Sequence, residues 1–461
     1  MEKTTDNKMA VMSVPGLILN MGLPMMLSML GQALYNVVDT FYVSRIPDSD
    51  GMVHAGEMAI NALTLAFPVQ MLIMALGVGT GVGVNAMISR LLGMKQKRQA
   101  ENAAGNALFV SFLYFLAMLL FGLFGSRAFI NSQTDNAVIA ELGTEYVRII
   151  SVFSLGTLGY MCLEKVTIAT GRTKITMLTQ IAGALTNILL DPVLIYGWLG
   201  FPAMGVKGAA IATVVGQFVS LVWIGVFYLK KNRIMTIRRS DLRPRGVILK
   251  ELYRIGIPSI VMQILVPIMS YAMNLILGGI SEAAVTAYGI YYKLQNFVFM
   301  PGYGLNNASI PIISFNYGAG SKDRIRAAIR WALIDVTVIM GIGVILLEGW
   351  TGSIVSLFAV SPETEGLCVT ALRIIVWGFF FAGVNIILQG VCQALGNGRF
   401  SLIISLIRLI VVPLPAAYFF ARAVQAQRLV WFSIPLGELT ASVAAVVLTM
   451  RLYRQKTETL S

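Results

Sequence analysis

Asn187 and Asp191 form the pair of polar residues whose spacing most clearly suggests chemistry. They lie four positions apart in the apolar run TNILLDP, residues 186–192. Residues four apart share one face of a helix and are about 6 Å apart along its axis. Pro192 has no N–H group, so it leaves the carbonyl oxygen of Ile188 without its usual helical partner. A carboxylate, an amide oxygen and a free carbonyl suit a proton or a small hard cation, and a polar contact at a proline kink is the structural alternative.

Asp39 is a second carboxyl group within an apolar segment. It belongs to the run YNVVDTFYVSR, residues 35–45, at the end of the first such segment. A charged side chain at the centre of a bilayer costs about 2.5–3.5 kcal/mol on insertion scales, so it marks a candidate functional site. Tyr35 and Asn36 share the helix face of Asp39 and could hydrogen-bond to it. In the alternative interpretation, Asp39 lies at the membrane surface close to Arg45.

Glu164 is the third carboxyl group of this kind, and Lys165 follows it directly. A lysine side chain can extend from the membrane interior to the interface, whereas a glutamate is too short to do so easily. Glu164 therefore either pairs with a basic neighbour or faces the interior of its helix bundle, and the sequence leaves both possibilities open.

The composition is that of a membrane protein. Of the 461 residues, 57% are hydrophobic and only 12% are charged, whereas a soluble protein has about 25% charged residues. The apolar residues form blocks of about twenty or more, which is enough to cross about 30 Å of hydrocarbon. The net charge of +13 would suggest nucleic-acid binding in a soluble protein. In a membrane protein it indicates basic cytoplasmic loops, and the apolar spans exclude a soluble nucleic-acid-binding protein.

Twelve membrane-spanning helices are predicted. Their approximate ranges are 15–44, 58–84, 103–125, 140–163, 176–198, 206–229, 252–278, 284–313, 328–348, 370–392, 401–420 and 431–450. The loops after even-numbered spans are basic, and those after odd-numbered spans are acidic or mixed except for the last. This bias predicts a multi-pass protein of the inner or plasma membrane with both termini in the cytoplasm.

The chain contains an internal repeat. The run GLP at 22–24 recurs as GIP at 256–258, and matching residues between 88 and 108 recur between 313 and 333. The spacing is 234 residues at the first match and 225 at the others, and a longer first outer loop accounts for the difference. The repeat predicts two six-helix bundles of the same orientation, related by a pseudo-two-fold axis along the membrane normal. Parallel repeats of this kind are typical of transporters.

The predicted domains are an N-lobe (1–229), a basic cytoplasmic linker (230–251) and a C-lobe (252–461). The repeat also allows the two halves to be compared position by position. The C-lobe counterparts of Asp39, Glu164, Asn187 and Asp191 are Met273, Gln389, Val412 and Ala416. A scaffold should be similar in both halves, so this asymmetry predicts that the chemistry lies in the N-lobe.

An enzyme is not expected. A membrane-embedded enzyme would need paired catalytic residues, such as the two histidines of an HExxH zinc motif. This chain has one histidine, His54, in a predicted loop, and three cysteines without metal-ligand spacing. The sequence therefore predicts no enzymatic activity and no cofactor.

These motifs resemble those of the multidrug and toxic compound extrusion (MATE) transporters. The runs at 35–45 and 187–192, GVGTG at 77–81 and ATGRTK at 169–174 carry the resemblance, which extends over nearly the whole chain. It looks closest to the prokaryotic branch of the DNA-damage-inducible F proteins. The resemblance implies export of organic, usually cationic, compounds driven by entry of protons or sodium ions.

The resemblance also implies roles for individual residues. The residues that it assigns to cation coupling, or to the metal site if the ion is sodium, are Asp39, Asn187 and Asp191. Tyr35 and Asn36 would lie beside them, and Thr213 would be the hydroxyl of the sixth span. Glu164 departs from the polar amide common in this branch and adds a titratable group to the coupling site.

The expected function is secondary active antiport by rocking of two lobes around an acidic pocket. A proton or sodium ion is the only non-protein group required, and the expected partners are the lipid bilayer and a small cationic or amphipathic substrate. The chain is expected to act as a monomer without nucleic acid. The alternative is a flippase of the same superfamily that moves lipids or lipid-linked oligosaccharides, which would need a cationic or wide groove.

Overall fold

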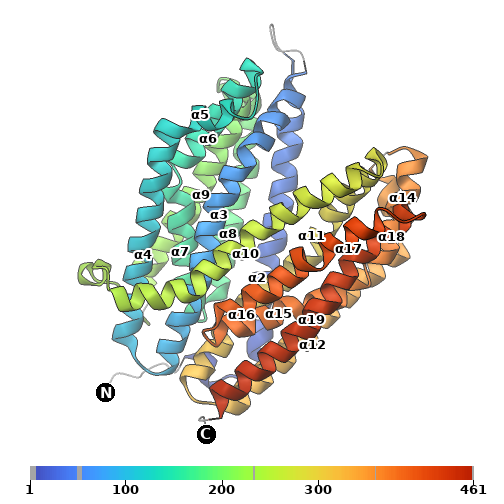
Figure 1. The fold of residues 1–461 in the computed structure, drawn as a ribbon. Helices are drawn as coiled ribbons and strands as arrows, with labels where there is room; N and C mark the ends of the chain where they lie inside the picture. Colours follow the sequence, from blue (N-terminus) through green and yellow to red (C-terminus); the bar gives the residue numbers. More distant parts are fainter. Residues whose placement is uncertain (1–6, 49–53, 232–233, 359, 459–461) are drawn as a thin grey trace. The chain divides into compact units, whose positions relative to one another are not determined.

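The computed structural model describes residues 7–48, 54–231, 234–358 and 360–458, and within these ranges every regular element is a helix (Figure 1). Residues 49–53 of the first predicted outer loop, and residues 232–233 of the predicted linker, lie outside the described residues.

The helices of the first half are mostly long and apolar. They are α1 (Lys8–Val11), α2 (Val14–Ser44), α3 (Ala55–Gly93), α4 (Lys97–Leu120), the π-helical turn η1 (Phe121–Gly125), α5 (Ser126–Asn131), α6 (Ala137–Val152), α7 (Leu155–Ala169), α8 (Thr173–Tyr196), the 3-10 turn η2 (Trp198–Gly200) and α9 (Gly205–Lys231).

The second half has the same character. Its elements are η3 (Arg239–Leu242), α10 (Gly246–Gly278), α11 (Glu282–Gly318), α12 (Lys322–Gly349), α13 (Thr351–Ser356), α14 (Pro362–Ile375), α15 (Gly378–Ala394), α16 (Gly398–Leu406), the π-helical turn η4 (Ile407–Val411), α17 (Pro413–Phe420), α18 (Ala426–Leu429), η5 (Val430–Phe432) and α19 (Ser433–Thr457).

The helices account for all twelve predicted spans. Nine helical segments of the described chain are long and apolar enough to cross a membrane. Two bent pairs qualify as broken spans: α6 with α7, bent by 44°, and α14 with α15, bent by 53°. Helix α11 lies at the remaining predicted span, 284–313, although it is not among the segments that meet this criterion of length and apolarity. The prediction of an all-α polytopic membrane protein is confirmed.

Contacts between residues divide the chain into two compact units. The N-terminal unit consists of Leu30–Ile88 and Gln96–Leu252, and the C-terminal unit consists of Met1–Met29, Ser89–Lys95 and Tyr253–Ser461. The predicted roles of the two lobes, and their limits at residues 229 and 252, stay predictions. A grouping by contacts assigns no activity to either unit.

A buried apolar core holds the N-terminal unit together. Val43, Ile73, Tyr146, Ile195 and Ala209 belong to this core, and their exposed fractions are all 3% or less. They come from five different helices, namely α2, α3, α6, α8 and α9. The core therefore packs these five helices together, and polar side chains next to it lie in buried surroundings.

The helix ends follow the repeat of the sequence. Helices α4 and α12 begin at Lys97 and Lys322, and α7 and α15 end at Ala169 and Ala394, so both pairs are 225 residues apart. Gly171 and Gly396 follow the latter two helices with φ angles of 84° and 82°. This left-handed conformation ends helices and favours glycine. The backbone of the two halves therefore corresponds position by position in this region.

A reciprocal glycine contact joins α3 and α11 within the C-terminal unit. A Cβ on Gly93 would collide with the carbonyl oxygen of Phe315, and a Cβ on Gly318 would collide with that of Arg90. These four residues are related by the same spacing of 225, so each repeat contributes one glycine and one carbonyl. Backbone atoms cannot move aside as a flexible side chain can, so the contact requires glycine on both sides.

We expect Gly318→Ala to lower the apparent Tm of the purified protein, because overpacking of this kind costs about 1–3 kcal/mol. Gly31→Ala is the matched control, since a Cβ there would meet no atom within 4 Å. The two variants and the parent would be heated in detergent, and the remaining monodisperse protein would be measured by size-exclusion chromatography. A Gly318→Ala protein as stable as the Gly31→Ala protein would contradict the contact.

Candidate functional site

Helices α8 and α9 approach each other closely because two glycines face each other. A Cβ on Gly183 would lie 2.7 Å from the carbonyl oxygen of Gly216, and a Cβ on Gly216 would lie 2.6 Å from that of Gly183. Ser220 of α9 also donates a hydrogen bond of 3.0 Å to the carbonyl oxygen of Thr179. Side chains on the facing sides of these two helices are consequently brought within hydrogen-bond distance.

Asn187 connects the two helices. Its amide nitrogen Nδ2 lies 3.4 Å from Asp191 Oδ1 on the same helix and 3.3 Å from Thr213 Oγ1 on α9. Asn187 is 2% exposed and Asp191 is fully buried. The predicted contact between residues four apart is therefore present, and α8 continues through Pro192 to Tyr196.

Three oxygen atoms at this site are buried without a hydrogen-bond partner among the described residues: Asp191 Oδ2, Asn187 Oδ1 and Asp39 Oδ1. Leaving a buried acceptor unsatisfied costs about 1–3 kcal/mol, and more for a charged group. A bound proton or small cation would satisfy such oxygens. Carboxylate and amide oxygens are hard ligands and fit either ion.

Asp39 approaches this cluster from α2. It is partly buried, and its charge interacts with that of Asp191. Tyr35, one turn earlier on α2, interacts with both carboxyl groups. Asn36 lies on an exposed side of the helix, where its backbone carbonyl accepts a hydrogen bond from Thr40. The cluster therefore consists of Asp39, Asn187 and Asp191, with Tyr35 and Thr213 beside them, and the role of Asn36 stays a prediction.

Tyr146 is a member of this site that sequence analysis missed. It lies on α6, is 2% exposed, and interacts electrostatically with Asp39 and Asp191. Gln70 of α3 donates a hydrogen bond of 3.2 Å to its hydroxyl group. Tyrosines are common in apolar segments, so no sequence signal distinguishes this one; only the packing of α6 places it here.

Glu164 and Lys165 form a buried ion pair on α7. Their exposed fractions are 5% and 2%, and Lys165 Nζ lies 3.5 Å from Glu164 Oε2. A Cβ on Gly81 of α3 would lie 2.6 Å from Lys165 Cγ, so α3 covers the lysine stem. Lys165 is thus buried rather than extended to the interface. Glu164 therefore pairs with a basic neighbour and is also buried inside the unit, so the two possibilities left open by the sequence are not exclusive, and its predicted coupling role stays a prediction.

A second buried ion pair lies in the C-terminal unit and was also missed. Arg408 of η4 and Glu438 of α19 are 7% and 6% exposed, and Arg408 Nε lies 2.7 Å from Glu438 Oε1. A charged residue within a predicted span marks a candidate functional position. Arg408 and Glu438 both lie within predicted spans, so the sequence did contain a signal for this pair.

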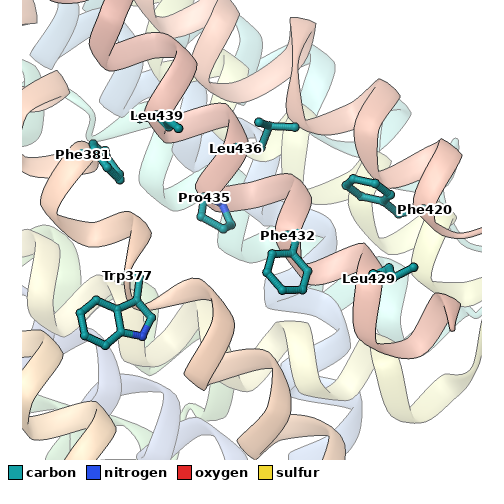
Figure 2. A pocket seen from close by; sticks show the side chains of 8 residues that line it. All are labelled: Trp377, Phe381, Phe420, Leu429, Phe432, Pro435, Leu436 and Leu439. Atoms are coloured by element: carbon teal, nitrogen blue, oxygen red, sulfur yellow. The ribbon is translucent and has the colours of Figure 1, made fainter.

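Two further features lie apart from the cluster of Asp39, Asn187 and Asp191: the cysteines and an apolar groove. In the described part of the chain, no group of three or more His, Cys, Asp or Glu residues could hold a metal ion, and the three cysteines are buried free thiols. A groove in the C-terminal unit has a volume of about 500 Å³, and Figure 2 shows the apolar side chains that line it. They are Trp377, Phe381, Phe420, Leu429, Phe432, Pro435, Leu436 and Leu439. Such a surface suits contact with hydrocarbon rather than with ions.

We expect Lys165→Met to destabilise the protein by about 3–5 kcal/mol, because it leaves the carboxylate of Glu164 buried and unpaired. The double variant Lys165→Met/Glu164→Gln should recover most of this loss, since it removes both charges. Unfolding of the purified variants in detergent would be followed by circular dichroism. A single variant as stable as the double variant would contradict the pairing.

Comparisons with known proteins identify the family and agree with the fold. A family model described as MatE matches residues 24–193 and 258–419. The multidrug export protein MepA of Staphylococcus saprophyticus is 23% identical over 431 residues, covering 94% of this chain and 92% of that protein. MepA of Staphylococcus haemolyticus is 25% identical over 384 residues, covering 83% and 82%.

Solved structures resemble the whole chain. One is described as an outward-facing conformation of a multidrug resistance MATE family transporter of the MOP superfamily; it has a TM-score of 0.92 and 25% identity, and covers all of both chains. Another, a MOP superfamily transporter from Pyrococcus furiosus whose binding pocket is described as reversed in polarity, has a TM-score of 0.90 and 26% identity over 99% of this chain and 100% of that chain. This chain belongs to the MatE family of multi-pass membrane transporters and is a transporter, not an enzyme.

Proposed function

We propose that this protein exports small organic compounds, organic cations in particular, in exchange for protons or sodium ions that enter the cell. The class of activity is supported by the family and by relatives described as multidrug export proteins. The coupling mechanism is supported by the cluster of Asp39, Asn187 and Asp191 in the N-terminal unit.

One observation carries the proposal: three oxygens of this cluster are buried without partners among the described residues. The same carboxylates can bind either a coupling cation or a cationic substrate. They cannot balance the charge of both at the same time. Binding of one therefore favours release of the other, which is what exchange requires. Thr213 accepts a hydrogen bond from Asn187, and Tyr35 interacts with both carboxyl groups.

The cycle has two steps that depend on this competition. When the cavity faces outward, a proton or sodium ion binds Asp39 and Asp191 and displaces the substrate. Neutralising the carboxylates lowers the cost of closing the cavity around them, and the two lobes rock to face inward. There the cation leaves, and the recharged cluster binds a new cationic substrate.

The proposal includes the setting of the protein. The chain acts as a monomer in the plasma or inner membrane with both termini in the cytoplasm, as the basic loops after even-numbered spans favour. The coupling ion is its only non-protein component. The carboxylates argue against a flippase for lipid-linked pyrophosphates, since a cluster of negative charge repels that head group.

We expect Asp39→Asn and Asp191→Asn each to slow efflux of a cationic dye from energised vesicles at least tenfold, because a loss of about 1.4 kcal/mol in cation binding corresponds to a factor of ten. Asp135→Asn is the control, since that residue is exposed and lies outside the cluster. Undiminished efflux with unchanged pH and sodium dependence in both variants would exclude the proposed coupling site.

A second experiment identifies the coupling ion. We expect a pH gradient or a sodium gradient, imposed separately on proteoliposomes, to drive substrate accumulation that Asp191→Asn abolishes. Only a gradient directed opposite to the substrate should be effective, because the exchange is obligatory. Accumulation that requires neither gradient would contradict antiport.

A further inference from the structure

The structure relates Glu438 to Thr213. The spacing of 225 residues that joins the ends of α7 and α15 also joins the first residues of α8 and α16, Thr173 and Gly398. Helices α9 and α19 follow the same spacing to within one residue at their ends, Lys231 and Thr457. Glu438 is therefore the C-terminal counterpart of the residue that accepts a hydrogen bond from Asn187. The C-terminal unit has a carboxylate where the N-terminal unit has a hydroxyl.

Both oxygens of this carboxylate are occupied. Arg408 Nε lies 2.7 Å from Glu438 Oε1 and 2.8 Å from Oε2. Asn385 Nδ2, from α15, donates to Oε2 and to the backbone carbonyl oxygen of Glu438, both at 2.9 Å. Ser442 Oγ in turn lies 3.2 Å from Asn385 Oδ1. Arg408 belongs to the segment α16–η4–α17, which is the counterpart of α8 and thus of the helix that carries Asn187 and Asp191.

The surroundings isolate the pair from water. Arg408 Cζ lies 5.7 Å from the centre of the Phe299 ring on α11. Among the described residues, two tyrosines of the same helix also face the pair: Tyr303 interacts with Arg408, and Tyr291 interacts with both Glu438 and Arg408. Asn385 is the polar group from α15, and it is fully buried.

Stability alone does not account for this arrangement. Apolar side chains of similar volume often stabilise a protein interior as well as a buried ion pair does. Charged residues within a membrane are costly and usually functional. Arg408 also lies in a π-helical turn, a distortion frequent at functional sites. The relevant comparison is with the N-terminal unit, where the cluster beside Thr213, the counterpart of Glu438, leaves three oxygens without hydrogen-bond partners among the described residues.

We propose that Arg408 is a permanently bound cation of the C-terminal unit. It neutralises Glu438, the counterpart of Thr213, throughout the transport cycle, as the exchangeable cation neutralises the carboxylates beside Thr213 in the N-terminal unit. The C-terminal unit then binds no coupling ion, and the ratio of cations to substrate is set by the N-terminal cluster alone. This inference rests on the proposed function, because it assigns coupling to one of two related sites.

A hydrophobic carbodiimide, N,N′-dicyclohexylcarbodiimide, tests the inference on the unaltered protein. The reagent adds to protonated carboxyl groups in apolar surroundings and forms a stable N-acylurea, which mass spectrometry of peptides locates. In the parent protein we expect labelling of Asp39 or Asp191, and protection by substrate. Glu438 should be labelled at least about tenfold less, because the guanidinium of Arg408 occupies both of its carboxylate oxygens. Labelling of Glu438 comparable with that of Asp191 would overturn the inference.

Variants then show whether Arg408 is the cause. Arg408→Met should raise labelling of Glu438 at least about tenfold, whereas Arg408→Lys, which keeps a cation beside it, should not. Arg408→Met/Glu438→Gln removes both charges and serves as the control for folding. A folded Arg408→Met protein in which Glu438 stays unlabelled would overturn the inference. If instead neither Asp39 nor Asp191 reacts in the parent, the proposed coupling site fails, which is a separate outcome.

Discussion

A carboxylate inside a membrane must be neutralised, because neither lipid nor a packed protein interior can solvate its charge. This chain meets the requirement differently in its two units. In the C-terminal unit the neutralising group is Arg408, which is part of the chain and remains beside Glu438. In the N-terminal unit, Asp39 and Asp191 each have a buried oxygen without a hydrogen-bond partner among the described residues, and the proposed function assigns their neutralisation to an ion from solution.

Close helix packing makes such sites possible. Gly183 and Gly216 bring α8 and α9 together, and Asn187 can then reach Thr213 across the contact. At another contact, the glycine lies on one helix in the first half and on the partner helix in the second half. Gly81 packs against Lys165 in the N-terminal unit, whereas Gly390 packs against Asn306 at the corresponding positions of the C-terminal unit. The fold thus tolerates different polar residues at a contact as long as one of the two partners is glycine.

The sequence predicts features that depend on composition or on local geometry. The twelve spans follow from the length of the apolar blocks, and the contact of Asn187 with Asp191 follows from the helical period. Features that depend on packing between distant segments were not predictable in this way. Arg408 and Glu438 are 30 residues apart in the chain and lie on different helical segments. Tyr146 lies at the cluster only because α6 packs there. The bends between α6 and α7 and between α14 and α15 were missed as well, because no proline marks them.

Because the scaffold is duplicated, one unit can keep a permanently bound cation while the other binds and releases an ion during transport. A ligand shifts a conformational equilibrium only by the difference between its affinities for the two states. A cation that is always bound has no such difference, so Arg408 contributes the same free energy whichever way the cavity faces. An ion that leaves and returns can differ in affinity between states, and the unpartnered oxygens around Asp191 supply the contacts through which it would do so. If both units took exchangeable ions, each transport cycle would require two neutralisation events to coincide. With Arg408 in place, a single event in the N-terminal unit is sufficient.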